Sequence, residues 1–141
     1  YHMCNAEVLS LCKDNTLLIN AARGGVVEEH ALIEKLTGGN GKVNIVIDCW
    51  ENEPQVNLSL LQRADLATFH IAGYSLEGKM NASEMCLRAF CEFFSLPILS
   101  INKKVVPLQG DSEPGWLKRI SDQLKAAPEH FEQLRKQYKL R

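Results

Sequence analysis

The sequence predicts an α/β fold built on a parallel sheet, because segments with strand character alternate with segments of helical periodicity. Three short runs rich in apolar and β-branched residues are predicted strands: 16–20, 42–48 and 66–70. The segments 28–36 and 58–63 between them carry apolar residues at helical spacing. Right-handed crossovers through these helices place the carboxyl ends of all three strands at one edge of the sheet.

The helices of the first half of the chain have recognisable ends. A first helix is expected over residues 5–13, where Asn5 is a suitable N-cap for the apolar residues that follow. The helix over 28–36 has acidic residues in its first turn and stops at Gly38 and Gly39, which are typical of a helix C-terminus.

The pattern changes after the third strand. A long helix is expected over 76–96 and ends before Pro97, and its methionine and phenylalanine stripe is predicted to be core. Two further helices are expected at 116–126 and 128–140. The change near Pro97 is the predicted domain boundary, which divides the chain into residues 1–96 and 97–141.

Composition excludes several functional classes. The 141 residues carry 16 Lys and Arg against 17 Asp and Glu, without a basic block, so nucleic acid is not an expected partner. No apolar run approaches the roughly 18 residues of a spanning helix. Five scattered cysteines without a Cys-x-x-Cys pair favour inert, reduced thiols over disulfides or a metal site. We therefore expect a soluble cytoplasmic protein.

Polar residues follow each predicted strand. Arg23 follows the first strand, Asp48 and Glu53 follow the second, and His70 ends the third. These side chains should converge at the carboxyl edge of the sheet, where open α/β folds bind ligands. Arg23 is suited to bind a carboxylate through its planar fork, and the two glycines after it allow the backbone to approach a ligand closely.

Each of these residues also has a simpler interpretation. Arg23 is equally well explained as a surface residue of a strand-to-helix loop, and a lone histidine such as His70 is more often part of a core. Glu53, taken alone, is a solvated loop acid. Together, Glu53 and His70 suggest an acid that orients an imidazole for proton transfer.

Three segments in order resemble the signatures of the NAD-dependent D-2-hydroxyacid dehydrogenases. They are Leu18-Ile-Asn-Ala-Ala-Arg-Gly-Gly-Val-Val-Glu28, Val46-Ile-Asp-Cys-Trp-Glu-Asn-Glu-Pro54 and His70-Ile-Ala-Gly73. The resemblance implies the C-terminal half of a Rossmann-like parallel sheet, followed by the start of a smaller α+β dimerisation domain. Residues 1–96 would be part of the NAD-binding domain, with the long helix returning toward the substrate domain, and residues 97–141 would begin the dimerisation domain of a homodimer.

The same resemblance implies a role for each matching residue. Arg23 would bind the substrate carboxylate and take part in catalysis, Glu53 would pair with the histidine, and His70 would be the proton donor and acceptor. The implied cofactor, NAD, would contact Asp48 and a set of loop residues, namely Ala21, Ala22, Arg23 and Gly73. Tyr74 would touch the substrate.

The continuation His70-Ile-Ala-Gly-Tyr-Ser-Leu-Glu-Gly-Lys79 and the C-terminal segment 128–138 resemble the branch of that family that acts on 4-phospho-D-erythronate. Other 2-hydroxy acids, of the phosphoglycerate or glyoxylate type, and a non-catalytic dimerisation module are the alternatives. The sequence contains no Gly-x-Gly-x-x-Gly turn and begins at Tyr1, so we expect a C-terminal fragment that is inactive alone.

Overall fold

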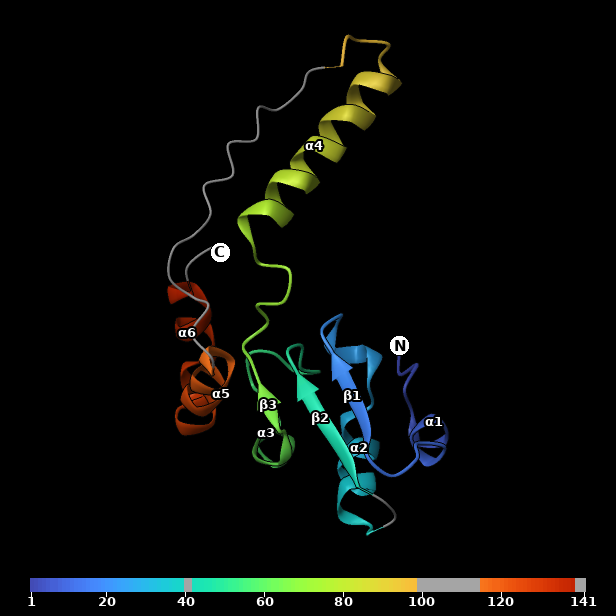
Figure 1. Ribbon diagram of the computed structural model, residues 1–141, viewed down its shortest axis with the longest axis vertical. Helices are drawn as coiled ribbons and strands as arrows, with labels where there is room; N and C mark the ends of the chain where they lie inside the picture. Colours follow the sequence, from blue (N-terminus) through green and yellow to red (C-terminus); the bar gives the residue numbers. More distant parts are fainter. Residues whose placement is uncertain (40–41, 99–114, 139–141) are drawn as a thin grey trace. The chain divides into compact units, whose positions relative to one another are not determined.

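The computed structural model describes residues 1–39, 42–98 and 115–138, and internal contacts divide them into two compact units. The first unit holds residues 1–71 together with 115–138, and the second holds residues 72–98 of the described chain. Figure 1 labels their helices and strands. Among the described helices, none is long and apolar enough to cross a membrane.

The first unit contains the predicted parallel sheet. Its strands are β1 (Thr16–Asn20), β2 (Val43–Ile47) and β3 (Leu66–Ala67), in the order β1-β2-β3. Asn20 pairs with Ile47, and Ile47 pairs with Ala67, so the three carboxyl ends lie side by side at one edge. This arrangement confirms the predicted topology.

The third strand is shorter than the predicted 66–70. The backbone beyond it still follows β2, because the Thr68 amide donates to the Ile47 carbonyl at 2.9 Å. The His70 amide donates to the Asp48 carbonyl at the same distance, but His70 itself has a φ of 58°. The chain therefore leaves the sheet at His70 through a left-handed residue.

Helices cover one face of the sheet. They are α1 (Ala6–Ser10), α2 (Glu29–Thr37) and α3 (Leu58–Arg63), and a short 3-10 turn, η1 (Gly24–Val26), precedes α2. Asn5 caps α1 as predicted, accepting a hydrogen bond from the Val8 amide at 3.1 Å. The sheet side chains that point toward the helices are apolar, and Leu32, Leu60 and Leu61 of α2 and α3 are fully buried.

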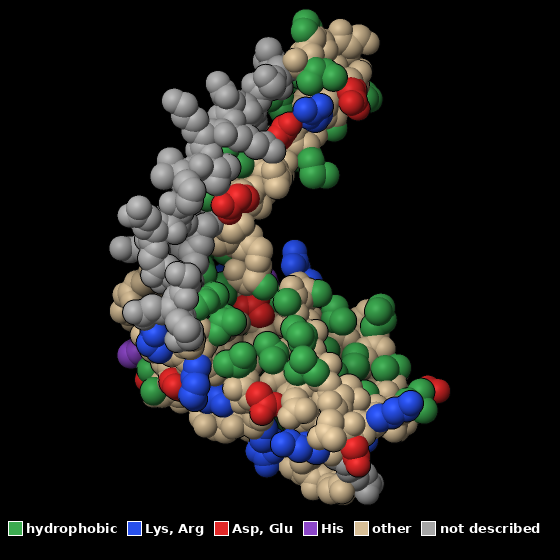
Figure 2. Space-filling model, viewed as in Figure 1, with side chains coloured by type: hydrophobic (Ala, Val, Ile, Leu, Met, Phe, Trp, Pro, Cys, Tyr) green, Lys and Arg blue, Asp and Glu red, His purple; other side chains and the backbone are tan. Residues whose placement is uncertain are grey.

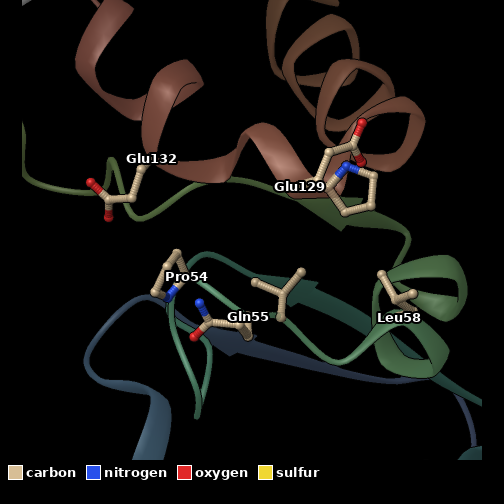
Figure 3. Close-up of a pocket in the computed structure, with 7 residues that line it drawn as sticks. Pro54, Gln55, Leu58, Glu129 and Glu132 are labelled. Atoms are coloured by element: carbon tan, nitrogen blue, oxygen red, sulfur yellow. The ribbon is translucent and has the colours of Figure 1, made fainter.

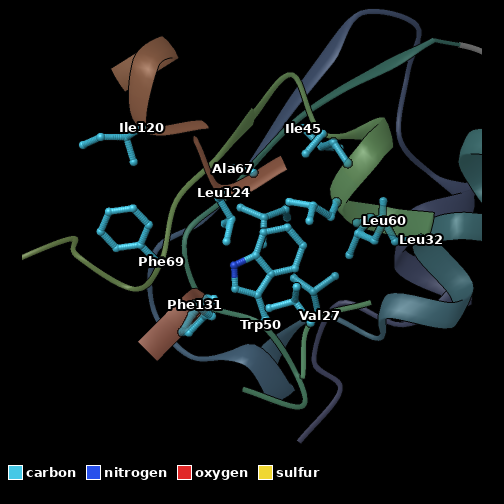
Figure 4. Close-up of a cluster of buried hydrophobic side chains, with 14 of the residues drawn as sticks. Val27, Leu32, Ile45, Trp50, Leu60, Ala67, Phe69, Ile120, Leu124 and Phe131 are labelled. Atoms are coloured by element: carbon cyan, nitrogen blue, oxygen red, sulfur yellow. The ribbon is translucent and has the colours of Figure 1, made fainter. Parts of the chain in front are cut away.

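The C-terminal helices complete the core of this unit. They are α5 (Trp116–Ala126), the turn η2 (Pro128–His130) and α6 (Phe131–Gln137). Figure 4 shows Trp50 among Val27, Leu124 and Phe131, so the core joins side chains from both ends of the chain. The buried Ser121 hydroxyl accepts a hydrogen bond from the Ala67 amide at 3.0 Å and so satisfies β3 on its outer side.

These contacts place residues 115–138 with the sheet, although the sequence assigns them to the second predicted domain, 97–141. Residues 99–114 of that predicted domain, and 139–140 of the last predicted helix, lie outside the described residues. The dimerisation role of residues 97–141 stays a prediction.

The opposite face of the sheet exposes apolar side chains of β1. Leu17 and Ile19 of β1 are 57% and 60% exposed, and Figure 2 shows a group of hydrophobic side chains over β1 and β2. Because alternate residues of a strand point to opposite faces, these side chains project away from α2 and α3.

The second unit contains one long helix, α4 (Leu76–Phe93), which the Ser75 hydroxyl caps by accepting from the Gly78 amide at 3.0 Å. The prediction that its aromatic stripe is core is wrong for the described chain. Phe93 is 82% exposed, and Cys91 is the one residue of α4 that is buried. Helical spacing shows that one face of α4 is apolar, but burial also requires a packed neighbour.

Candidate active site

The segments that follow β1, β2 and β3 form the candidate site. They bring Asp48, Glu53 and His70 together at the carboxyl edge of the sheet, as the strand pattern predicts. In open α/β sheets this edge is where ligands bind.

His70 and Glu53 form the central contact of the site. The distance between Nδ1 of His70 and Oε2 of Glu53 is 2.8 Å, and the other carboxylate oxygen accepts from the Trp50 amide at 2.8 Å. The two side chains are 23% and 19% exposed, so they are sheltered but reachable. Because an ionised carboxylate only accepts hydrogen bonds, a neutral His70 ring beside it carries its proton on Nδ1 and presents the lone pair of Nε2. This is the arrangement of a base held by an acid.

The backbone of His70 is held in its left-handed conformation by its neighbours. Such a conformation is unfavourable for a residue with a side chain, and it persists where surrounding contacts impose it. Phe69 and Ile71 on either side are buried, and the Ile71 amide donates to Oδ1 of Asp48 at 2.8 Å. The buried residues Phe69 and Ile71 therefore fix the backbone position from which the His70 imidazole projects.

Asp48 has a structural task as well as its predicted cofactor contact. Its side chain is buried, and Oδ1 also accepts from the Thr68 hydroxyl at 2.5 Å. One carboxylate therefore joins the end of β2 to the segment that leads into His70. Its contact with the nicotinamide stays a prediction.

The loop of Ala21, Ala22 and Arg23 is fixed by Asn20, a residue to which the sequence assigned no role. The buried Asn20 amide donates to the carbonyls of Arg23 and Cys49, at 3.1 and 3.0 Å, and so joins the ends of β1 and β2. Arg23 itself is exposed, and its Nη1 donates to the Ala22 carbonyl at 2.7 Å. The signal available in the sequence for this role was an asparagine at the end of an apolar strand.

Gly24 is required for packing within the protein. A Cβ atom at this position would lie 1.9 Å from the Trp50 carbonyl oxygen, closer than any side chain allows. Gly25 faces the ring of Tyr1. The close neighbours of these glycines within the protein are therefore Trp50 and Tyr1, and the expected approach of their backbone to a ligand stays a prediction.

Two acids next to the site have shifted pKa values in opposite directions. Burial raises the pKa of Glu29, which accepts from the Glu51 amide at 2.8 Å and faces the charges of Glu51 and Glu53. The pKa of Glu51 is lowered, first by a hydrogen bond from the Tyr1 hydroxyl and also by His2. These contacts hold the first residues of the chain against the 50–53 segment.

Gly73 and Tyr74 belong to the second unit, so their predicted contacts with cofactor and substrate stay predictions. Gly73 has a φ of 77°, a conformation that favours glycine. The Lys79 ammonium lies 3.9 Å from the centre of the Tyr74 ring.

A separate groove of about 470 Å³ lies between the 54–58 segment and the C-terminal helices. Figure 3 shows Pro54, Gln55 and Leu58 facing Glu129 and Glu132 across it. It contains neither Glu53 nor His70, and its two acids would repel an anionic substrate. We therefore assign the candidate active site to the edge of the sheet that carries His70, and not to this groove.

Comparisons with known proteins agree with this geometry. Residues 1–72 match the D-isomer specific 2-hydroxyacid dehydrogenase family, in the part described as its NAD binding domain. Three curated relatives carry the name erythronate-4-phosphate dehydrogenase. The one from Bacteroides fragilis is 38% identical over 151 aligned residues, which cover 100% of this chain and 43% of that protein.

The relatives from Photorhabdus laumondii and Porphyromonas gingivalis are 44% and 48% identical over 97 residues. These alignments cover 69% and 68% of this chain and 26% of each relative. The chain thus spans less than half the length of these three curated relatives. Its parallel sheet is consistent with the Rossmann-like NAD-binding domain that the matched region represents. The chain belongs to the D-isomer specific 2-hydroxyacid dehydrogenase family.

Proposed function

We propose that the complete protein oxidises 4-phospho-D-erythronate at C2 to 2-oxo-3-hydroxy-4-phosphobutanoate, with NAD as the oxidant. The observation that carries the proposal is the 2.8 Å contact between Glu53 and His70 at the carboxyl edge of a parallel sheet. The names of the relatives support the choice of substrate.

His70 is the proposed proton acceptor. Its Nε2 atom takes the proton of the substrate 2-hydroxyl group while the hydride leaves C2, which turns the alcohol into a ketone. Glu53 stabilises the imidazolium that forms, because its carboxylate already holds Nδ1 at 2.8 Å. In the reverse direction the same atom returns the proton.

Arg23 is the proposed carboxylate anchor. It is exposed, and Asn20 fixes its backbone at the edge where His70 also lies. A guanidinium binds a carboxylate through two parallel hydrogen bonds, which orient the neighbouring C2 atom as well as holding it. Tyr74 is the proposed second substrate contact.

NAD, when bound, supplies the nicotinamide ring that accepts the hydride. The residues at this edge suit it: the exposed Ala21 and Ala22 have small side chains that leave room for a flat ring. Asp48 is the proposed acceptor for the carboxamide of the cofactor, and Gly73 is proposed to line the cofactor.

The proposed activity assigns the protein to the biosynthesis of pyridoxal 5'-phosphate in the cytoplasm. We also propose that it acts as a homodimer, to which residues 97–141 contribute. Light scattering of the purified complete protein measures this assembly directly.

The experiment on substrate uses the complete protein and follows NADH at equal enzyme concentration. The acids to compare are 4-phospho-D-erythronate and 3-phosphoglycerate, with glyoxylate in the reductive direction. We expect kcat/KM to be at least about tenfold higher for 4-phospho-D-erythronate, a difference of about 1.4 kcal/mol in transition-state stabilisation. A higher value for another acid would reassign the substrate, and no turnover with any acid would favour a non-catalytic module.

A further inference from the structure

A third potential ligand atom lies beside the catalytic pair. The Sγ atom of Cys49, a carboxylate oxygen of Glu53 and a ring nitrogen of His70 all lie within 4.8 Å of one another. They form the one group of three potential metal ligands found among residues 1–39, 42–98 and 115–138. The proposed dehydrogenase chemistry uses Glu53 and His70 and gives Cys49 no task.

The three ligand types are those that Zn²⁺ and similar thiophilic cations prefer. Zinc binds sulfur at about 2.3 Å and nitrogen or oxygen at about 2.0–2.2 Å, so ligand atoms around it stand roughly 3.5 Å apart. Closing from 4.8 Å to this separation requires side-chain movements of about 1 Å. Glu53 and His70 are partly exposed, which leaves an approach from solvent and a position for water.

Two carboxylates, those of Asp48 and Glu53, act on the buried Cys49 thiol. Burial raises the pKa of its thiol to about 12, and the negative charges of Asp48 and Glu53 act in the same direction, opposed by Arg23. A divalent cation near Sγ would interact with the same two carboxylates more strongly than a proton does.

We propose that Cys49, Glu53 and His70 bind a thiophilic divalent cation such as Zn²⁺, and that the bound cation blocks His70 from accepting a proton. On binding, the Cys49 thiol releases its proton to solvent and the thiolate bonds to the metal. Nδ1 of His70, which lies 2.8 Å from Glu53, bonds to the metal through its lone pair, so the ring proton moves to Nε2 by exchange with solvent. Nε2 then has no lone pair with which to accept the substrate proton. The proposed metal binding rests on the geometry alone. The proposed inhibition of His70 by the metal rests on the proposed dehydrogenase function.

The first experiment measures metal binding by the complete protein with Zn²⁺ in competition with a chromophoric chelator. We expect one site that Cys49→Ser weakens at least about tenfold. Cys86→Ser is the matched control, because Cys86 is exposed and lies outside the three-residue group. Equal affinity in the wild type and Cys49→Ser, or a loss only in Cys86→Ser, would overturn the proposed site.

Cobalt gives a second readout that does not depend on affinity. A Co²⁺ ion bound to a thiolate shows a sulfur-to-metal charge-transfer absorption, which we expect in the wild type and not in Cys49→Ala or Cys49→Ser. Circular dichroism of both variants checks that they fold, since Cys49 is buried. Charge-transfer absorption that persists in both folded variants would assign the metal to another cysteine.

The pH dependence tests the identity of the ligand. While the free thiol is protonated, each unit of pH should raise the apparent zinc affinity about tenfold for the proton lost from Cys49. We expect Cys49→Ser to reduce this slope by one proton. A slope unchanged by the substitution would contradict thiolate ligation.

The block is tested by assaying the complete protein with and without Zn²⁺, and again after adding a chelator. We expect reversible inhibition of the wild type and at least about tenfold weaker inhibition of Cys49→Ser. Equal inhibition of both would show that zinc acts elsewhere. If the protein had no dehydrogenase activity, the proposed function and the block would both fail, while direct binding would still decide the metal site.

Discussion

Glu53 holds His70 through one carboxylate oxygen and the Trp50 backbone amide through the other, both at 2.8 Å. The carboxylate is therefore oriented before it meets the imidazole. This double attachment fixes the ring tautomer, with the proton on Nδ1 and the lone pair of Nε2 facing outward.

Glu53→Gln should reverse that tautomer. The new amide oxygen would accept from the Trp50 amide, and its NH₂ group would then donate to Nδ1, which moves the ring proton to Nε2. We expect kcat for oxidation to fall by roughly a hundredfold or more, because Nε2 no longer has a lone pair to accept the substrate proton.

Steady-state kinetics of the complete protein measure this effect. Glu51→Gln is the matched control, because Glu51 is a neighbouring acid bonded to Tyr1 and His2. A Glu53→Gln variant with wild-type kcat would show that Glu53 does not set the tautomer of His70.

His70→Ala should separate chemistry from binding. Proton transfer commonly supplies roughly two to four decades of rate, so we expect kcat to fall by that amount while the Kd for NAD stays within a few fold. Rapid kinetics and calorimetric titration of the complete protein give the two quantities. His30→Ala, on the exposed side of α2, should change neither; a large loss of NAD binding in His70→Ala would mean that the residue acts mainly in the fold.

Arg23→Lys should keep the charge and lose the planar fork. We expect kcat/KM for the 2-hydroxy acid to fall by roughly tenfold or more, about 1.4 kcal/mol per decade. Arg63→Lys provides the control, since Arg63 is an exposed arginine of α3 that donates to Ser59. An unchanged kcat/KM in Arg23→Lys would argue against carboxylate binding.

Glu29→Gln should stabilise the protein increasingly as pH rises from 4 to 7. The pKa of the buried Glu29 is raised in the folded state, so the stability it contributes at low pH is lost as pH rises through that folded value. Glutamine keeps an acceptor for the Glu51 amide and has no charge to bury. A gain near 1 kcal/mol corresponds to a Tm increase of roughly 2–4 °C.

Thermal unfolding of the complete protein at several pH values measures this effect. Glu34→Gln, an exposed acid on the same helix, should leave the pH dependence of Tm nearly unchanged. A Tm difference between Glu29→Gln and wild type that shrinks as pH rises would contradict the sign of the predicted effect.

The 141-residue chain alone should bind NAD weakly and show no dehydrogenase activity. Its sequence contains no Gly-x-Gly-x-x-Gly turn to hold the cofactor phosphates, so most of the affinity for the dinucleotide is expected to be missing. Its open apolar sheet face should also promote self-association. Saturable NAD binding near micromolar together with turnover would overturn this prediction.

Local pattern predicted much of the fold and the central contact of the site. The runs that form β1 and β2 are marked by apolar and β-branched residues, and the rule that parallel strands end at one edge placed Glu53 beside His70. The remaining contacts depend on partners distant in the sequence. Asn20 meets Cys49 across two strands, and Thr68 meets Asp48, so neither pattern nor spacing identifies them.

The other differences between expectation and structure have the same origin. The stripe on α4 is apolar at helical spacing, but spacing does not show whether a neighbour covers it. The glycine at position 24 was expected to let the backbone approach a ligand, and the structure adds a second reason for it, the close Trp50 carbonyl. In both cases the residue type indicated an apolar or a closely packed position. Which neighbour the residue meets depends on tertiary packing.

The shared core of Trp50, Leu9 and Phe131 has a consequence for synthesis of the protein. On the ribosome, the sheet segments emerge first, yet α5 and α6, which cover β3 and Trp50, emerge only after residues 72–112 have been made. At about 5–20 residues per second, roughly 3–12 seconds separate Ile71 from Phe131. During that interval the nascent chain exposes the side of its core that α5 and α6 later cover.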